Sequence, residues 1–367
     1  MTVARALELI ERADRTWELR AQAMLLDESI ALAREANDAG VEYAARLRAV
    51  PNAAMRFEVS EAVTHLAWCV ARHDDDPASH PRRLDRTEDV LYLEDWALRQ
   101  LALSDALAPA RVTELIDAHE RRLAGTGPHA VSVLRALHAW ALGDADAAAA
   151  HIDEAILTPG DAMTHCIRCT RDIAAQIADS AGRVEAAIAA CDDYAAEPCV
   201  DADQPASALS RGLFAWTAMG RMPDAEAAYA SASRRVQARP TTPEVLGRLA
   251  RYALATGRFD EALKHVESAL PWAMGSALAT HLRMSALREL AAVLSGLEAA
   301  GLGSEPLSTA GDPRVGRLLP TGHQPWTVAQ AAPRAVAAAR HLAERFDARG
   351  GTTFHVEHLE RTLTGVA

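Results

Sequence analysis

The strongest constraint on the fold is a repeated spacing of glycine and alanine. Four glycines recur at intervals of 39, 38 and 37 residues: Gly143, Gly182, Gly220 and Gly257. An alanine follows each of them five positions later. Glycine ends a helix by accepting the left-handed backbone conformation, and a small residue one turn into the next helix lets two helix axes approach closely. The spacing therefore predicts stacked helix pairs in a repeat array.

The length of the chain also limits the architecture. At 367 residues it exceeds the roughly 250 to 300 at which a single hydrophobic core stops growing. The chain must therefore form two domains or a solenoid that extends its core sideways. Alanine is abundant, aromatic residues make up only 5%, and few stretches alternate β-branched residues. We predict an all-α fold, an α-solenoid of stacked antiparallel helix pairs, with almost no strand.

Two segments of the array carry a family resemblance. The stretches GRFDEALKHVESAL at 257–270 and GRMPDAEAAYASA at 220–232 resemble the second-helix motif of tetratricopeptide repeats of the bacterial type. The period here is longer than the 34 residues of that family. The resemblance implies a superhelix in which the first helix of each pair lines a concave inner face, and this face binds protein segments.

The punctuation of the sequence predicts four regions. The array has regular turns, whereas the region before it does not; there, Gly40 followed by Ala45 suggests a degenerate early repeat. A stretch rich in glycine and proline follows the array, and the last predicted helix, from Phe354, can cover an exposed apolar end. The regions are an N-terminal helical region at 1–125, the repeat array at 126–295, a linker or cap at 296–325 and C-terminal helices at 326–367.

Charge and hydropathy exclude several classes of partner. The formal net charge of −12 gives a surface that repels phosphate backbones, so we expect no nucleic-acid partner. No window approaches the roughly 20 apolar residues that span a bilayer, so we expect no membrane partner either. Five irregularly spaced cysteines and a first segment that lacks an apolar stretch predict a reduced, cytoplasmic protein.

The resemblance to tetratricopeptide repeats implies a set of binding residues. Counting back from each turn glycine along the first helix of its pair gives the positions that face the groove in that family. Aromatic residues at these positions can anchor apolar side chains of a peptide, and polar ones can hold its backbone or charges. Packing between neighbouring helices is the alternative for the aromatics, and solvation for the polar residues. The candidates are Trp140, Asp172, Gln176, Phe214 and Arg251.

The segment THCIRCT contains the densest group of metal-ligating side chains. Cys166 and Cys169 are three residues apart, and with Cys191 or Cys199 they can form a tetrahedral zinc site. Cysteine is also a common buried core residue, and the sequence has no second closely spaced pair. We therefore predict buried thiols, with no metal and no cofactor, and keep the metal or thiol site as the less favoured alternative.

Other chemical motifs are weaker. His355 and His358 within FHVEH lack the spacing of a metalloprotease helix, so we predict a surface helix. The run HDDD at 73–76 is followed by prolines and arginines, which indicates a solvated loop. The sequence has no phosphate loop, no dinucleotide glycine fingerprint and no nucleophile elbow, so we predict that the protein is not an enzyme.

These observations favour one function and leave a second open. We expect a non-catalytic scaffold that binds a protein or peptide on the concave face of the array. The alternative is a signal-responsive regulator that binds a small ligand or a peptide. Whether the C-terminal helices cover the groove stays open from the sequence.

Overall fold

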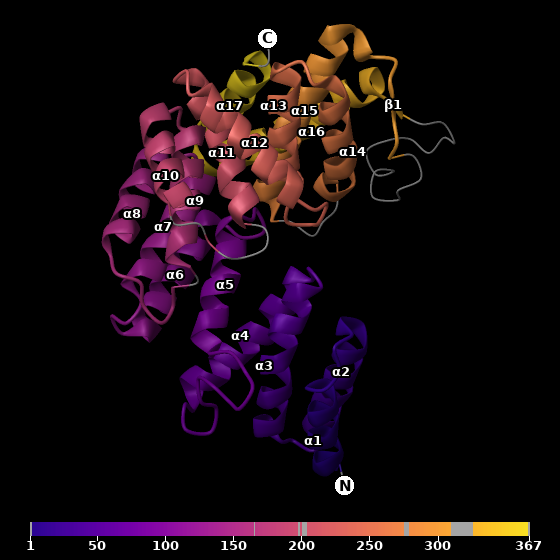
Figure 1. Cartoon of the computed structure of the whole chain (residues 1–367). Coiled ribbons are helices and arrows are strands. Elements are labelled where there is room, and N and C mark those ends of the chain that lie inside the picture. The colour runs from indigo at the N-terminus through magenta and orange to yellow at the C-terminus, as the bar shows by residue number, and fades with distance from the viewer. Residues whose placement is uncertain are drawn as a thin grey trace. The chain divides into compact units, whose positions relative to one another are not determined.

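The fold consists of helices joined by short turns (Figure 1). The computed structural model describes residues 2–164, 166–196, 199, 204–274, 279–309 and 326–365. Within these ranges the strands are β1 (Pro306–Leu307) and β2 (Trp326–Thr327), which pair antiparallel. The prediction of an all-α fold with almost no strand is confirmed.

The chain divides into two units. The first unit contains Met1–Gln100 and Leu115–Thr126, and the second contains Leu101–Glu114 and Gly127–Ala367. Helices α5 and α6 cross the boundaries between these ranges. In the first unit, α1 packs on α2, α2 on α3, and α3 on α4. The first six helices are α1 (Thr2–Ala13), α2 (Leu19–Glu35), α3 (Ala39–Met55), α4 (Val59–Asp75), α5 (Val90–Ala102) and α6 (Pro109–Leu123).

The structure corrects the predicted role of Gly40. This residue lies in the first turn of α3, and its backbone is not left-handed. The left-handed residue between α2 and α3 is Asn37, with φ of 52°, and Asp38 caps α3 by accepting a hydrogen bond from the backbone N–H of Val41 at 3.0 Å. Asparagine tolerates the left-handed region better than most residues. A search for turn glycines therefore misplaced this turn.

The second unit is built from successive helix pairs. The pairs α7/α8, α9/α10, α11/α12 and α13/α14 each pack internally, and α15 packs on α16. Figure 1 shows these helices following one another in chain order. The helices are α7 (Pro128–Ala141), α8 (Ala145–Leu157), α9 (Ile167–Ser180), α10 (Val184–Ala196), α11 (Gln204–Ala218), α12 (Met222–Arg235), α13 (Pro243–Ala255), α14 (Phe259–Ala273), α15 (Thr280–Leu297), α16 (Val328–Gly350) and α17 (Phe354–Thr364), and a π-helical turn, η1 (Glu298–Leu302), follows α15.

The four turn glycines have the backbone conformation that the sequence predicts. Their φ angles lie between 71° and 76°. The residue after each glycine donates its backbone N–H to the carbonyl five residues earlier, at 2.8–3.0 Å, which satisfies the end of the first helix. The four alanines five positions after the glycines are at most 2% exposed. Tight turns and close helix contacts therefore produce the helical repeat, as predicted.

The first helices of successive pairs form a continuous layer. Helix α9 packs on α11, α11 on α13, and α13 on α15. Helices α16 and α17 pack on α15 and on each other. The last helix starts at Phe354, as predicted. We call the layer formed by α9, α11, α13 and α15 the inner layer. Helix α17 packs against it through α15.

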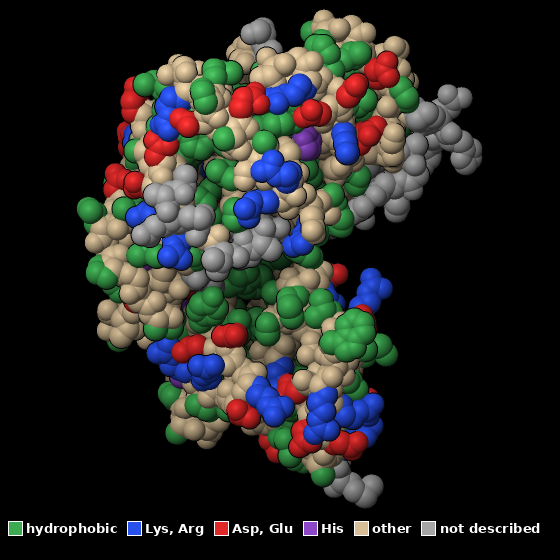
Figure 2. Space-filling model, in the orientation of Figure 1, with side chains coloured by type: hydrophobic (Ala, Val, Ile, Leu, Met, Phe, Trp, Pro, Cys, Tyr) green, Lys and Arg blue, Asp and Glu red, His purple; other side chains and the backbone are tan. Residues whose placement is uncertain are grey.

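The outer surface has no broad field of one charge on the face that Figure 2 shows, where acidic and basic side chains are interspersed. Among the helices that the structure describes, none combines the length and the apolar character needed to cross a membrane.

The end of α16 makes a backbone contact that tests the packing of the second unit. A Cβ atom on Gly350 would lie 1.8 Å from the carbonyl oxygen of Leu142, whereas a Cβ on Gly182 would meet nothing within 4 Å. We expect Gly182→Ala to cost about 1 kcal/mol through its left-handed backbone alone. Gly350→Ala should cost at least about 1 kcal/mol more, because the backbone of α16 or α7 must move. Urea unfolding followed by circular dichroism measures both, and equal losses would contradict this packing.

Candidate functional site

Trp140 is buried beneath the C-terminal part of the second unit. It is 2% exposed, and its ring contacts the ring of His281 edge-on, with 4.1 Å between centroids. His281 also contacts Phe346 and His355, at centroid distances of 5.1 and 5.0 Å. Trp140 is therefore a packing residue in this conformation and does not line an open channel.

Asp172 and Gln176 connect α9 to the next first helices. Each is 6% exposed. Asp172 accepts hydrogen bonds from Arg211 Nε at 2.5 Å and from Ser207 Oγ at 3.1 Å, both on α11. Gln176 Nε2 donates to both carboxylate oxygens of Glu244 on α13, at 3.4 Å each. These polar residues hold neighbouring helices together and are not solvated.

Phe214 and Arg251 lie together between α11 and α13. Both side chains are partly exposed. The guanidinium carbon of Arg251 lies 3.6 Å from the centroid of the Phe214 ring, and Arg251 Nε is 2.8 Å from a carboxylate oxygen of Glu289 on α15. A cation over an aromatic face is an attractive arrangement. Four of the residues found by counting back from the turn glycines thus lie in one layer: Asp172, Gln176, Phe214 and Arg251. Their role in binding stays a prediction.

The centre of the inner layer contains a buried group of charged side chains that the sequence pattern did not predict. Arg248, 2% exposed, forms an ion pair with Glu244 one turn earlier on α13. Arg211 Nη1 and Arg288 Nη2 lie 3.8 and 4.0 Å from the same Glu244 oxygen. The spacing of Glu244 and Arg248 is visible in the sequence, but charged residues four apart on a helix usually mark a solvated face.

The inner layer has more hydrogen-bond donors than acceptors. Burial lowers the pKa of Arg248, and its Nε and Nη1 atoms have no hydrogen-bond partner among the described residues. Arg211 Nη1 and Arg288 Nε also have no hydrogen-bond partner among the described residues. Burial alone would raise the pKa of Glu289, but the guanidinium groups of Arg251 and Arg288 lower it below its ordinary value. Unpaired buried donors are costly, so the layer favours an added acceptor.

Helix α17 lies on this layer. Nδ1 of His358 is 3.2 Å from Arg288 Nη1, and Arg361 Nη2 donates to the carbonyl of Ser180 at the end of α9, at 2.8 Å. His355 Nε2 is 3.1 Å from the carbonyl oxygen of Ala141 on α7. The prediction of a surface helix for FHVEH is wrong: His355 and His358 are 3% and 7% exposed because α17 packs on the first helices.

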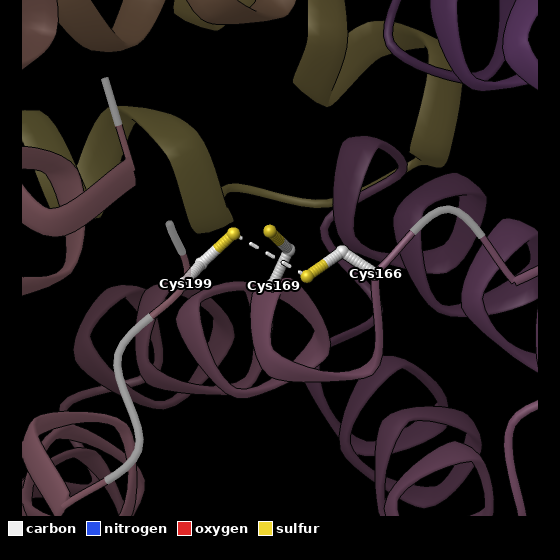
Figure 3. A group of neighbouring side chains, drawn as sticks. All are labelled: Cys166, Cys169 and Cys199. Atoms are coloured by element: carbon white, nitrogen blue, oxygen red, sulfur yellow. Dashed lines mark hydrogen bonds between the residues drawn. The ribbon is translucent and has the colours of Figure 1, made fainter. Parts of the chain in front are cut away.

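Three thiols converge at the beginning of α9 (Figure 3). The Sγ atoms of Cys166, Cys169 and Cys199 lie within 4.8 Å of one another, and those of Cys166 and Cys199 are 3.5 Å apart. Cys191 points elsewhere, with its Sγ 4.0 Å from the carbonyl oxygen of Ala208. The structure thus selects Cys199 from the two partners that the sequence left open. His165, from the same motif, lies outside the described residues.

Comparison with known proteins assigns no family to the chain. No protein-family model matches it, and no curated protein sequence matches it. The resemblance to tetratricopeptide repeats therefore depends on the two motif segments and on the pairing of the helices.

Breaking a buried ion pair of the inner layer should be costly, because the remaining charge is left without its partner. We expect Glu244→Gln to lower the free energy of unfolding by about 3–5 kcal/mol, because it leaves the buried Arg248 without its paired charge. Glu11→Gln is the control: Glu11 pairs with Arg15 at 3.2 Å, and both side chains are more than two-thirds exposed. The control should hardly change the stability. Urea unfolding measures both variants, and similar effects would show that the buried pair adds nothing specific.

The buried histidines predict a loss of stability in mild acid. Burial lowers the pKa of His355 to about 4, and it lowers the pKa values of His281 and His358 well below their ordinary range. As the pH falls, the unfolded chain binds these protons first. The contribution of these histidines to the free energy of unfolding should therefore be fully present above about pH 6.5. It should decline toward pH 4, by up to about 1.4 kcal/mol per pH unit for each histidine.

His281→Phe tests this prediction because both ring nitrogens of His281 are without a hydrogen-bond partner among the described residues. The variant should lose less stability between pH 7 and pH 5 than the wild type, as measured by urea unfolding at each pH. His341→Phe, at an exposed position of α16, should keep the slope of the wild type. An unchanged slope in His281→Phe would contradict the prediction.

Proposed function

We propose that this protein is a non-catalytic scaffold of the tetratricopeptide type that binds a protein or peptide segment on its inner layer. The observation that carries the proposal is α17: a helix of the chain itself lies on the layer, held through α7, α9 and α15. A surface that holds one amphipathic helix in this way has the side chains to hold another. The protein acts by presenting this surface, without turnover.

The chemistry of the inner layer favours an acidic partner. Arg211, Arg248 and Arg288 have buried N–H groups that lack acceptors among the described residues. Carboxylates are the strongest acceptors for guanidinium groups. The partly exposed ring of Phe214 beside Arg251 can receive an apolar side chain of the same segment. A protein segment suits this site better than nucleic acid, because the net charge of −12 opposes a phosphate backbone.

Binding on this layer requires exchange with α17. Trp140, Asp172 and Gln176 are buried while α17 is docked. Because α17 is tethered, it competes at a high effective concentration, and it lowers the apparent affinity for any partner in trans. We therefore propose that the partner is an acidic amphipathic helix that replaces α17. The five cysteines are odd in number and irregularly spaced, which fits a reducing compartment, and we propose the cytoplasm.

A cavity in the first unit favours a second candidate, a regulator that binds a small ligand. The cavity has a volume of about 520 Å³, which suits a small molecule. Leu7 and Ile10 contribute apolar walls. The polar part of the lining is balanced in charge, because Arg15, Arg48 and Arg86 lie beside the carboxylates of Glu11, Asp14 and Asp85. A small polar molecule that raises the melting temperature of the wild type but not of Arg15→Ala would favour this candidate.

Removal of α17 should expose the binding surface. We expect a chain that ends at Gly351 to capture a specific protein from a lysate of its native cell at least about tenfold more strongly than the full chain does, because the competing helix is gone. A synthetic peptide of residues 353–365 should release the captured protein. Quantitative mass spectrometry of the captured material gives the measurement.

Arg251→Ala in the shortened chain should abolish this capture. The matched control is Arg258→Ala. Arg258 also lies over an aromatic ring, at 4.2 Å from the centroid of Tyr229, and also pairs with a glutamate, Glu226. It differs from Arg251 in its place, because it lies at the start of α14, outside the inner layer. Circular dichroism checks that both variants fold. Equal capture by the full and shortened chains, or equal loss in both variants, would refute binding on the inner layer.

A further inference from the structure

We infer that Cys166, Cys169 and Cys199 form a zinc site in which three thiolates bind the ion and the fourth position is open to solvent or to an external ligand. The inference is independent of the proposed scaffold function. It starts from the convergence in Figure 3, where the three side chains point toward one another from the beginning of α9 and from the segment between α10 and α11.

The spacing of the sulfur atoms suits tetrahedral zinc. With Zn–S bonds of about 2.3 Å, the sulfur atoms of a tetrahedral site lie roughly 3.8 Å apart. The Sγ atoms of Cys166 and Cys199 are 3.5 Å apart, and all three lie within 4.8 Å of one another. The observed separations of 3.5 Å and at most 4.8 Å thus bracket the separation that a tetrahedral site requires.

The position of the thiols on the helix favours thiolates. Cys166 is the N-cap of α9, where the first backbone N–H groups of the helix stabilise negative charge.

The surroundings leave room for entry and for a fourth ligand. Cys166 and Cys169 are partly exposed, whereas Cys199 is 8% exposed and packs against Tyr194 and Ala208. On binding, each thiol releases its proton to solvent and its sulfur donates a pair of electrons to Zn²⁺, with no change of oxidation state. Thiolates are also soft ligands that suit Cu(I), which the test must distinguish.

The test measures metal binding by the reduced full-length protein. After dialysis against Zn²⁺ under anaerobic conditions and removal of free metal, we expect one zinc per chain by mass spectrometry of the metal. Replacement by Co²⁺ should give the thiolate-to-metal charge-transfer band and the visible absorption of a tetrahedral site. Changes in outer-shell partners already cost 10–100-fold in affinity, so Cys166→Ser, Cys169→Ser and Cys199→Ser should each weaken zinc binding by at least about 100-fold.

Cys191→Ser and Cys69→Ser are the controls, because both replace buried thiols outside the cluster, and both should retain one zinc. A second measurement needs no variant. Bound zinc should protect Cys166, Cys169 and Cys199 from alkylation and leave the reactivity of Cys69 and Cys191 unchanged. Failure to retain zinc, uptake of Cu(I) without zinc, or equal loss of zinc in the cluster and control variants would overturn the inference.

Discussion

The inner layer depends on one buried carboxylate, Glu244. It forms an ion pair with Arg248 on its own helix and lies near the guanidinium groups of Arg211 and Arg288. It also accepts a hydrogen bond from the side-chain amide of Gln176. One side chain of α13 thus joins α9, α11 and α15. Burial of this many charges costs free energy, and only their mutual pairing offsets it. Removal of the central acceptor therefore affects every helix of the layer.

Charge pairing also gives the layer a specificity that alanine cannot give. Small residues let helices approach, but an alanine surface packs about equally well in several registers. The contact between Asp172 and Arg211 is satisfied in one register only. The close approach of α13 and α15 adds to this, since a Cβ on Gly247 would lie 2.6 Å from Cβ of Glu289. Small residues set the distance between the helices, and the ion pairs set their alignment.

The sequence allowed prediction of the elements but not of what covers them. Turn glycines such as Gly143 act locally, so their role follows from spacing alone. The burial of His355 follows from a contact with Ala141, 214 residues away, and periodicity carries no information about such a partner. Counting back from the turn glycines found the face on which Gln176 lies, but it could not tell that α17 occupies that face. The choice of Cys199 over Cys191 likewise required the positions of these two side chains in the fold.

Helix α9 connects the features that the two proposals use. Its first turn carries Cys169. Asp172 follows three residues later and pairs with Arg211 of α11. Its last turn ends at Ser180, whose carbonyl accepts the hydrogen bond from Arg361 of α17. An ion held by the thiols would tie the first turn of α9 to Cys199, and the pair of Asp172 with Arg211 ties the same helix to α11. The proposed ligands and the contact with α17 thus lie at opposite ends of one packed helix, Ile167–Ser180, and the pair of Asp172 with Arg211 lies between them.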